Sequence, residues 1–476
     1  MTVVDEDAGA SERLPTHREI TGAERAEQGR VARQQTPRSS HAGWAPAQDR
    51  RDPVELLAEQ NETRVPWLVP IRHARMRVSP FTFFRGSARI MAADLAATPR
   101  SGLDVQLGGD AHLSNFGGYA SPSRELVFDQ NDFDETLPGP WEWDVKRLAT
   151  SFFVAARHLG LGRTAAREVT AATVKSYRTA MAIYGAAGYL DLWYQYTSVA
   201  DVERDDGTAQ RAKQLERFER HARAKTSLEA LGKLAEDVDG RYRIRSRPPV
   251  LVPLSELRDE YDPDALEAST VEGFERYKET LSDERHALLD RYTPLDVGVK
   301  VVGVGSVGTL CLVMLLEGRD RDDPLFLQIK EAAPSVMEEF LTPSTYANRG
   351  RRVVEGQRLI QAQSDIFLGW TEGSIEHRHF YVRQLRDWKG SVVIERATPG
   401  DLEFYGQLCG KTLARGHART GDGVAIAEYM GKSDRFDRAI ADFAEAYEAQ
   451  NRLDHEAFVT AIADGQLPVS DNPDVL

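Results

Sequence analysis

The residues best suited to chemistry lie between positions 109 and 135. Residues 109–115 read G-D-A-H-L-S-N, with Asp110 five positions before Asn115 and His112 between them. Residues 127–135 read V-F-D-Q-N-D-F-D-E. In phosphoryl transfer, a protein positions and deprotonates an acceptor hydroxyl and supplies oxygen ligands for Mg²⁺. We therefore expect Asp110 to be the base, with His112 orienting the loop. The expected metal ligands are Asn115 and Asp129, with Asp132 and Asp134 as further candidates.

These carboxylates have a simpler interpretation as a solvated surface loop, because acidic side chains are usually exposed. Apolar residues, however, alternate with the carboxylates, among them Phe116, Phe128 and Phe133. A purely solvated loop would not need these aromatic rings. We therefore favour a folded acidic loop.

A glycine-rich turn at residues 303–308 is the second candidate. It reads G-V-G-S-V-G and contains Gly303, Gly305, Ser306 and Gly308. A dinucleotide-binding turn would have to open a helix. The following T-L-C-L-V-M-L-L is only eight residues long before a charged turn, which fits a buried strand better. The pattern therefore predicts a hairpin that covers nucleotide phosphates.

Lys330 ends the next expected strand, F-L-Q-I-K-E-A. A lysine in this position contacts the α- and β-phosphates in kinases and pairs with a glutamate on the following helix. We expect that partner to be Glu355, with Glu338 and Glu339 as alternatives. A solvated strand end and a surface helix charge are the competing interpretations.

Three arginines lie close together in R-M-R-V-S-P-F-T-F-F-R-G, namely Arg75, Arg77 and Arg85. Contact with a phosphate or an acceptor is one interpretation, but we expect structural ion pairs with the acidic loop. His417 is either a site residue or an ordinary histidine at a helix end.

The surrounding pattern predicts a helix at 52–61 with Asp52 as N-cap, and another at 84–97. Strands are expected at 103–109 and 124–129 on either side of a turn-rich loop, followed by a helix that Asp144 caps and a largely helical stretch to about 291. Residues 297–332 read as three strands. A helix near 348–363, a strand pair ending at 379–385, and helices near 401–419 and 433–450 complete the chain.

We thus expect an α+β fold in four parts. Residues 1–50 would form a disordered or loosely packed arm, and residues 51–292 a mainly helical catalytic lobe. Residues 293–390 would form a β-rich nucleotide-binding lobe, and residues 391–476 helices that pack on the catalytic lobe.

The acidic segment resembles the aminoglycoside phosphotransferase-like branch of the kinase superfamily, in which a loop H-G-D-x-H-x-x-N precedes a strand ending in I-D and a P-x-x-x-D-L-A helix. The matching residues are Gly109, Asp110, His112, Asn115, Asp129, Pro140 and Asp144, whereas Gly108 replaces the leading histidine. Most of the chain also resembles an uncharacterised bacterial domain family grouped with that superfamily. The resemblance implies a two-lobe, kinase-like fold that uses ATP and Mg²⁺.

The order of the motifs is unusual, because the glycine turn and Lys330 follow the catalytic loop by about 200 residues. The first lysine of the chain is Lys146, so no lysine upstream can fill the phosphate role. We favour circular permutation of the kinase-like fold. The alternative is that one of the two motifs is unrelated to function.

Composition excludes other classes. The formal net charge of −14 argues against a nucleic-acid or anionic-membrane binder. Two cysteines, Cys311 and Cys409, suit a reducing compartment, and no apolar run reaches transmembrane length, so we expect a cytoplasmic protein.

The favoured hypothesis is an ATP- and Mg²⁺-dependent phosphotransferase whose acceptor is a hydroxyl of a small molecule or protein. Nucleotidyl transfer from the same site and a nucleotide-binding pseudoenzyme are alternatives. A phosphohydrolase with Asp110 and His112 as metal ligands ranks lower, because the further histidine ligands of two-metal sites are missing.

Overall fold

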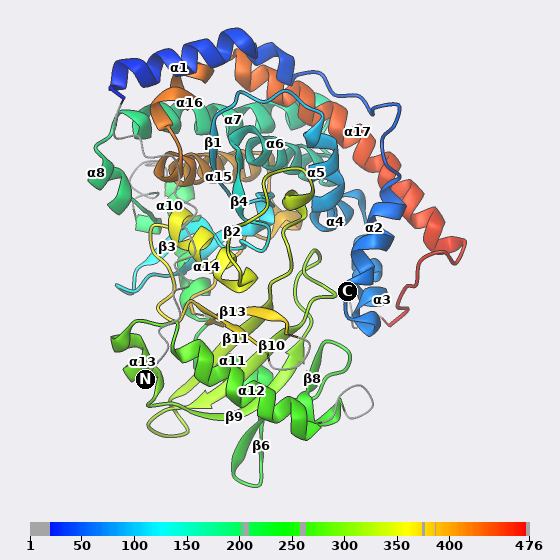
Figure 1. Ribbon diagram of the computed structural model, residues 1–476, viewed down its shortest axis with the longest axis vertical. Coiled ribbons are helices and arrows are strands. Elements are labelled where there is room, and N and C mark those ends of the chain that lie inside the picture. Colours follow the sequence, from blue (N-terminus) through cyan, green and yellow to red (C-terminus); the bar gives the residue numbers. More distant parts are fainter. Residues whose placement is uncertain are drawn as a thin grey trace, which may run out of the picture.

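The computed structural model describes residues 20–200, 202, 209–257, 263–373, 377–385 and 387–472. The protein is α+β: long helices form one part and a six-stranded sheet with its own helices forms the other (Figure 1). The α+β class expected from the sequence is therefore confirmed. The candidate site residues lie where the two parts meet.

The helical part is built around long helices that come from both halves of the chain. Here α7 packs along α15, while α6 and α17 pack together. The rings of Trp141 and Tyr177 stack in this core with their centroids 5.7 Å apart. The bounds of these helices are α6 (Trp141–His158), α7 (Arg163–Ala186), α8 (Tyr189–Tyr194), α10 (Ala209–Arg223), α15 (Pro399–Thr420), α16 (Gly423–Met430) and α17 (Arg435–Ala463).

Two expectations about helix starts need correction. Helix α6 begins at Trp141, so Asp144 lies in its first turn and is not its N-cap. The N-terminal arm is also partly ordered, because α1 (Gly22–Gln35) has a capping box at Thr21 and packs on α16. Residues 1–19 of the expected arm lie outside the described residues.

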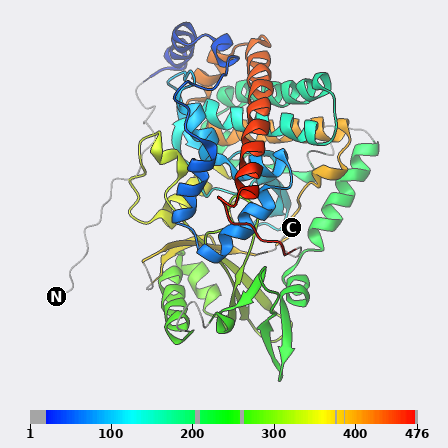
Figure 2. The ribbon, with the colours of Figure 1, turned by 90° about the vertical axis from the view of Figure 1, so that its right-hand side faces the viewer.

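The N-terminal helices form a wall beside the core. Asp52 caps α2 (Pro53–Glu62) as expected, because its carboxylate accepts the backbone N–H groups of Val54 and Glu55. The single helix expected at 84–97 is instead two, α4 (Pro80–Gly86) and α5 (Ala88–Ala96), which break at Ser87. Helix α3 (Val69–Met76) precedes them, and Figure 2 shows these blue helices beside the red α17.

The large sheet is antiparallel and has the order β12-β13-β11-β10-β9-β8. The three consecutive strands predicted between 297 and 332, the helix after them and the following strand pair are all confirmed. Their bounds are β9 (Thr293–Lys300), β10 (Cys311–Glu317), β11 (Pro324–Glu331), α14 (Arg349–Ile360), β12 (Gly369–Glu372) and β13 (His379–Gln384).

The expected boundary near residue 292 is too late, because the sheet part begins earlier. The edge strand β8 (Leu251–Pro253) pairs with β9, and helices α11 (Ser227–Leu234) and α12 (Pro263–Lys278) pack on the sheet. Helix α13 (Asp283–Leu289) leads into β9. The stretch expected to be largely helical also contains β5 (Thr197–Ser198) and the hairpin β6 (Ala235–Val238) and β7 (Arg241–Ile244).

Two small sheets hold the acidic segment. Strand β1 (Asp104–Leu107) pairs with β4 (Leu137–Pro140), and β3 (Leu126–Gln130) lies between β2 (Phe116–Ala120) and β5. The turn-rich loop expected between the first two strands therefore contains strand β2 and the 3₁₀ turn Leu113–Asn115.

None of the described helices is long and apolar enough to cross a lipid bilayer.

Candidate active site

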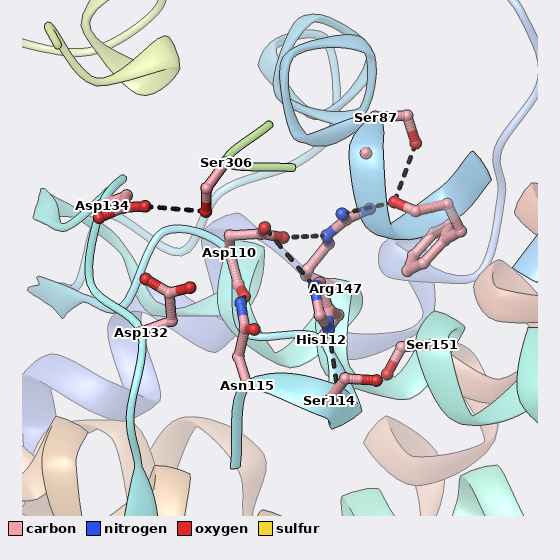
Figure 3. Close-up of polar contacts among 12 residues, drawn as sticks. Ser87, Asp110, His112, Ser114, Asn115, Asp132, Asp134, Arg147, Ser151 and Ser306 are labelled. Carbon is pink, nitrogen blue, oxygen red and sulfur yellow. Dashed lines mark hydrogen bonds and ion pairs between the residues drawn. The ribbon is translucent and has the colours of Figure 1, made fainter. Parts of the chain in front are cut away.

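A cleft of about 480 Å³ lies between the two parts of the protein. Its walls come from the N-terminal helices, the acidic loop and the glycine turn, and they include Asp110, Asn115, Asp132, Asp134 and Ser306. Figure 3 shows these five side chains around one space, with Arg147 beside Asp110.

Lys330 meets the acidic loop at this cleft. Its Nζ lies 2.7 Å from Oδ2 of Asp134 and 3.3 Å from Oδ1 of Asp132, although these residues are nearly 200 positions apart. The Tyr381 hydroxyl donates a 2.6 Å hydrogen bond to the other oxygen of Asp134. The predicted meeting of the amine and the carboxylates is therefore present in the structure.

The charges of this cluster stabilise one another. Burial acts to lower the pKa of Lys330, but the negative charges of Asp132 and Asp134 have the larger combined effect and raise that pKa well above its usual value. Burial also acts to raise the pKa of Asp134, yet Lys330 and the Tyr381 hydrogen bond leave that pKa below its usual range. For Asp132, burial and the neighbouring Asp134 charge raise the pKa. Asp134 is thus the better neutralised of the two carboxylates.

Asp110 lies on the opposite wall of the cleft. Its Oδ1 accepts a 2.8 Å hydrogen bond from Nε of Arg147, and its Oδ2 lies 3.7 Å from Nε2 of His112. Burial raises the pKa of Asp110 although Arg147 opposes that rise. Burial and the charges of Arg147 and Arg85 lower the pKa of His112 well below its usual value. His112 is therefore neutral near pH 7.

His112 and Asn115 shape the loop that carries Asp110. The backbone N–H of Ser114 donates to Nδ1 of His112, which places the proton of the neutral ring on Nε2, facing Asp110. The side-chain amide of Asn115 donates a 2.8 Å hydrogen bond to the carbonyl oxygen of Asp110. This bond uses the nitrogen of Asn115 and not the oxygen that a cation would bind.

The loop is anchored from the core by Asp144. Its carboxylate accepts the N–H groups of Gly108 and Gly109 at 2.7 and 3.0 Å, and His417 lies 3.3 Å away. Gly109 has a φ of 82°, and a Cβ there would lie 2.0 Å from the carbonyl oxygen of Glu135. A glycine is thus required immediately before Asp110. His417 is buried and acts on the site only through Asp144.

The glycine turn lies over the acidic loop. The Ser306 hydroxyl donates to Asp134 at 3.2 Å, and the Gly303 carbonyl accepts from Arg75 at 2.6 Å. Gly303 and Gly308 have positive φ angles of 68° and 107°, which favour glycine. Gly303, Gly305 and Ser306 line the cleft, whereas Gly308 lies against Arg64.

Four predicted site residues do not line the cleft, namely Gly308, Lys330, Asp129 and Glu355. Asp129 forms a buried ion pair with Arg415 at 2.5 Å and does not line the cleft, so the structure gives no support for its predicted role as a metal ligand. The glutamate assigned as partner of Lys330 was wrong, because Glu355 pairs with Arg358. The alternatives Glu338 and Glu339 lie near Arg352 and Arg89. Asp132 and Asp134 take that partner role instead.

Among the described residues, Arg77 and Arg85 do not form the predicted ion pairs with the acidic loop. Arg77 lies 3.7 Å from Asp471, and Arg85 lines the cleft without an ion pair. Sequence reasoning also missed Arg147, which holds Asp110. Arg147 follows Lys146 and lies about one helical turn after Asp144. This position on the same helix could have indicated that Arg147 faces the loop.

The described residues contain no group of three or more His, Cys, Asp or Glu side chains that could by itself hold a metal ion. The cleft instead offers the carboxylates of Asp132 and Asp134 and the amide of Asn115. Mg²⁺ is often bound by one or two carboxylates together with substrate phosphates. The donor set suits such a shared site and not a closed metal cage.

Fold and cleft together define an α+β protein in which a lysine-bearing sheet and an acidic loop share one site. The family described as "Uncharacterized protein conserved in bacteria (DUF2252)" matches residues 64–461, and the chain belongs to this family. No curated protein and no solved structure matches the chain.

Proposed function

We propose that this protein is a kinase-like phosphotransferase that moves the γ-phosphoryl group of ATP to a hydroxyl of a small molecule or protein. The observation that carries the proposal is the ion pair of the buried Lys330 with Asp132 and Asp134, two carboxylates that line the same cleft as Asp110. Phosphoryl transfer needs a cation for the phosphates, carboxylates for Mg²⁺ and a base for the acceptor, all in one place.

The sheet part supports this proposal by its order of elements. The glycine turn joins β9 to β10, the lysine lies near the end of β11, and α14 follows before β12 and β13. Kinases use the glycine loop, the lysine strand and the next helix in the same order. In this chain the unit follows the catalytic loop, so we infer a two-lobe fold that is circularly permuted.

The cleft has the donors that a magnesium nucleotide requires. Asp132, Asp134 and Asn115 would hold the metal, and Lys330 and the Gly303–Ser306 side of the turn would contact the phosphates. When bound, Mg²⁺ neutralises the charge that develops on the transferred group. Because Asp132 follows β3 directly, it replaces Asp129 as the first choice of metal ligand.

The acceptor side depends on Asp110. Its partly buried carboxylate has a raised pKa, which makes it a stronger proton acceptor than a solvated aspartate while it is ionised. Arg147 fixes the orientation of this carboxylate, and neutral His112 borders it without competing for the acceptor proton. Asp144 holds the turn before it in place.

The test is thermal unfolding of the whole protein with a non-hydrolysable ATP analogue, with and without Mg²⁺. At about one hundred times its Kd, a ligand specific for the native state adds about 2.7 kcal/mol of stability. Asp132→Asn should lose most of the Mg²⁺-dependent part, whereas Asp322→Asn, at an exposed turn, should keep it. The absence of any shift in the wild type would reject the ATP site.

A turnover assay separates the two transfer reactions. Release of ADP together with a phosphorylated acceptor supports phosphoryl transfer. Release of pyrophosphate would instead identify a nucleotidyl transferase that uses the same residues.

A further inference from the structure

Arg85 differs from the other arginines that line the cleft. It lies in the last turn of α4, and its guanidinium is 5.9 Å from the centre of the Phe81 ring. Among the described residues its guanidinium has no hydrogen-bond or ion-pair partner, and its Nε is buried without one. A guanidinium carries five N–H donors, so a buried one without acceptors is costly unless something else binds it.

The neighbouring arginines each have protein partners. Arg147 pairs with Asp110, and Arg89 pairs with Glu59 and Glu339. Arg64 donates to the carbonyl oxygen of Val307. Each of these arginines thus has at least one protein partner, although Nε of Arg64 is also buried without one, whereas the guanidinium of Arg85 lines the cleft with none among the described residues.

The charges around Arg85 do not replace an ion pair. Burial lowers its pKa, while the charges of Asp110 and Glu395 oppose that change without reversing it. The first of these carboxylates, Asp110, is already paired with Arg147. Arg75 adds a second positive charge close by, since burial and the charge of Arg85 lower the pKa of Arg75. Beside Asp110, the charges of Arg147 and Arg85 therefore act on one carboxylate, although the cleft as a whole is lined by more acidic than basic side chains.

We propose that Arg85 binds an anionic group, a phosphate or a carboxylate, on the acceptor whose hydroxyl Asp110 deprotonates. This inference rests on the proposed function and narrows its substrate class to hydroxyl compounds that carry an oxyanion. Arginine is suited to this task because its planar fork donates two parallel hydrogen bonds to phosphate or carboxylate.

The position of Arg85 favours the acceptor over the nucleotide. Lys330 and its carboxylates belong to the wall formed by the sheet and the segment after β3. Arg85 comes from α4 on the opposite wall, where it acts on Asp110 and His112. Because Asp110 must contact the acceptor hydroxyl to deprotonate it, the nearby guanidinium of Arg85 is placed to contact the acceptor as well.

The test uses inorganic phosphate as a probe of the oxyanion site in the full-length protein. Phosphate affinity is measured by calorimetry, first alone and then with the Mg²⁺ complex of a non-hydrolysable ATP analogue at saturation. Arg85→Gln should weaken phosphate binding at least tenfold and leave the affinity for the analogue within about twofold. Arg77→Gln, an exposed arginine nearby that pairs with Asp471, is the matched control and should change neither affinity.

The outcomes separate the two proposals. Equal phosphate binding by the wild type and Arg85→Gln would overturn the anion site, whatever the nucleotide does. Displacement of phosphate by the analogue, or loss of analogue binding in Arg85→Gln, would assign Arg85 to the nucleotide and overturn the acceptor role. If the analogue does not bind the wild type, the phosphotransferase proposal is rejected, and with it the acceptor role of Arg85. This holds even if phosphate binding depends on Arg85. Arg85→Lys keeps the charge and should recover part of the phosphate affinity, which guards against a folding defect in Arg85→Gln.

Discussion

The buried pair of Asp129 and Arg415 provides a quantitative test of the reassignment of Asp129. The two side chains are 3% and 1% exposed, and their closest N···O distance is 2.5 Å. The contact uses Nη2 of Arg415, whereas its Nε and Nη1 are buried without a hydrogen-bond partner among the described residues. Asp129 is thus the main compensation for a buried guanidinium.

Asp129→Ala should therefore be strongly destabilising. Removal of one partner from a buried ion pair typically costs about 3–5 kcal/mol, because the other charge is left without compensation. The double variant Asp129→Leu with Arg415→Met removes both charges and replaces them with apolar side chains. It should be more stable than Asp129→Ala, since such replacements are often neutral.

The free energy of unfolding can be followed in urea by the fluorescence of the seven tryptophans. The Mg²⁺-dependent stabilisation by an ATP analogue should survive in Asp129→Ala, measured well below its unfolding midpoint, because this residue does not line the cleft. A loss of less than about 1 kcal/mol would refute the role of the pair in stability. Selective loss of the Mg²⁺ effect without destabilisation would return Asp129 to the metal site.

Two further predictions concern the acidic loop. Gly109→Ala introduces a Cβ 2.0 Å from a backbone carbonyl at a positive φ, so it should destabilise the protein by more than about 1 kcal/mol in urea unfolding and reduce turnover. Gly102→Ala, also at positive φ but with open space around it, is the control for the backbone effect alone. Burial raises the pKa of Glu135 from 4.5 to about 7, so the native state favours its protonated form. The stability that protonated Glu135 contributes is complete below pH 4.5 and is lost as the pH rises through 7. Glu135→Gln should therefore flatten the pH dependence of the free energy of unfolding between these two pH values. An unchanged slope in this variant would show that Glu135 is not the group responsible.

The local elements around the site could be predicted because their patterns are local. Strands β9, β10 and β11 are separated by turns of distinctive composition, and Asp52 caps α2 in the way that its spacing with Pro53 predicts. The convergence of Lys330 with the acidic loop also followed from the chemistry that each segment needed. Apart from the meeting of Lys330 with the acidic loop, these predictions did not require knowledge of distant partners.

The errors arose where a distant residue decides the environment. Asp129 looks like a strand-end metal ligand until Arg415, 286 positions later, takes its carboxylate. Glu355 lies on the expected helix but faces Arg358, whereas Asp132 and Asp134 are close enough to serve Lys330. Strand β2 was hidden because its F-G-G-Y-A sequence resembles a loop and pairs only in the presence of β3.

The packing of α7 along α15 also has a consequence for synthesis of the protein. Helix α7 ends at Ala186 and α15 begins at Pro399, so the ribosome adds 212 residues between them (399 − 186 − 1). At about 5–20 residues per second this takes roughly 10–40 s. Throughout that interval α7 can pack on α6, but its face toward α15 lacks its native cover, so we expect the unfinished chain to expose apolar surface until α15 is made.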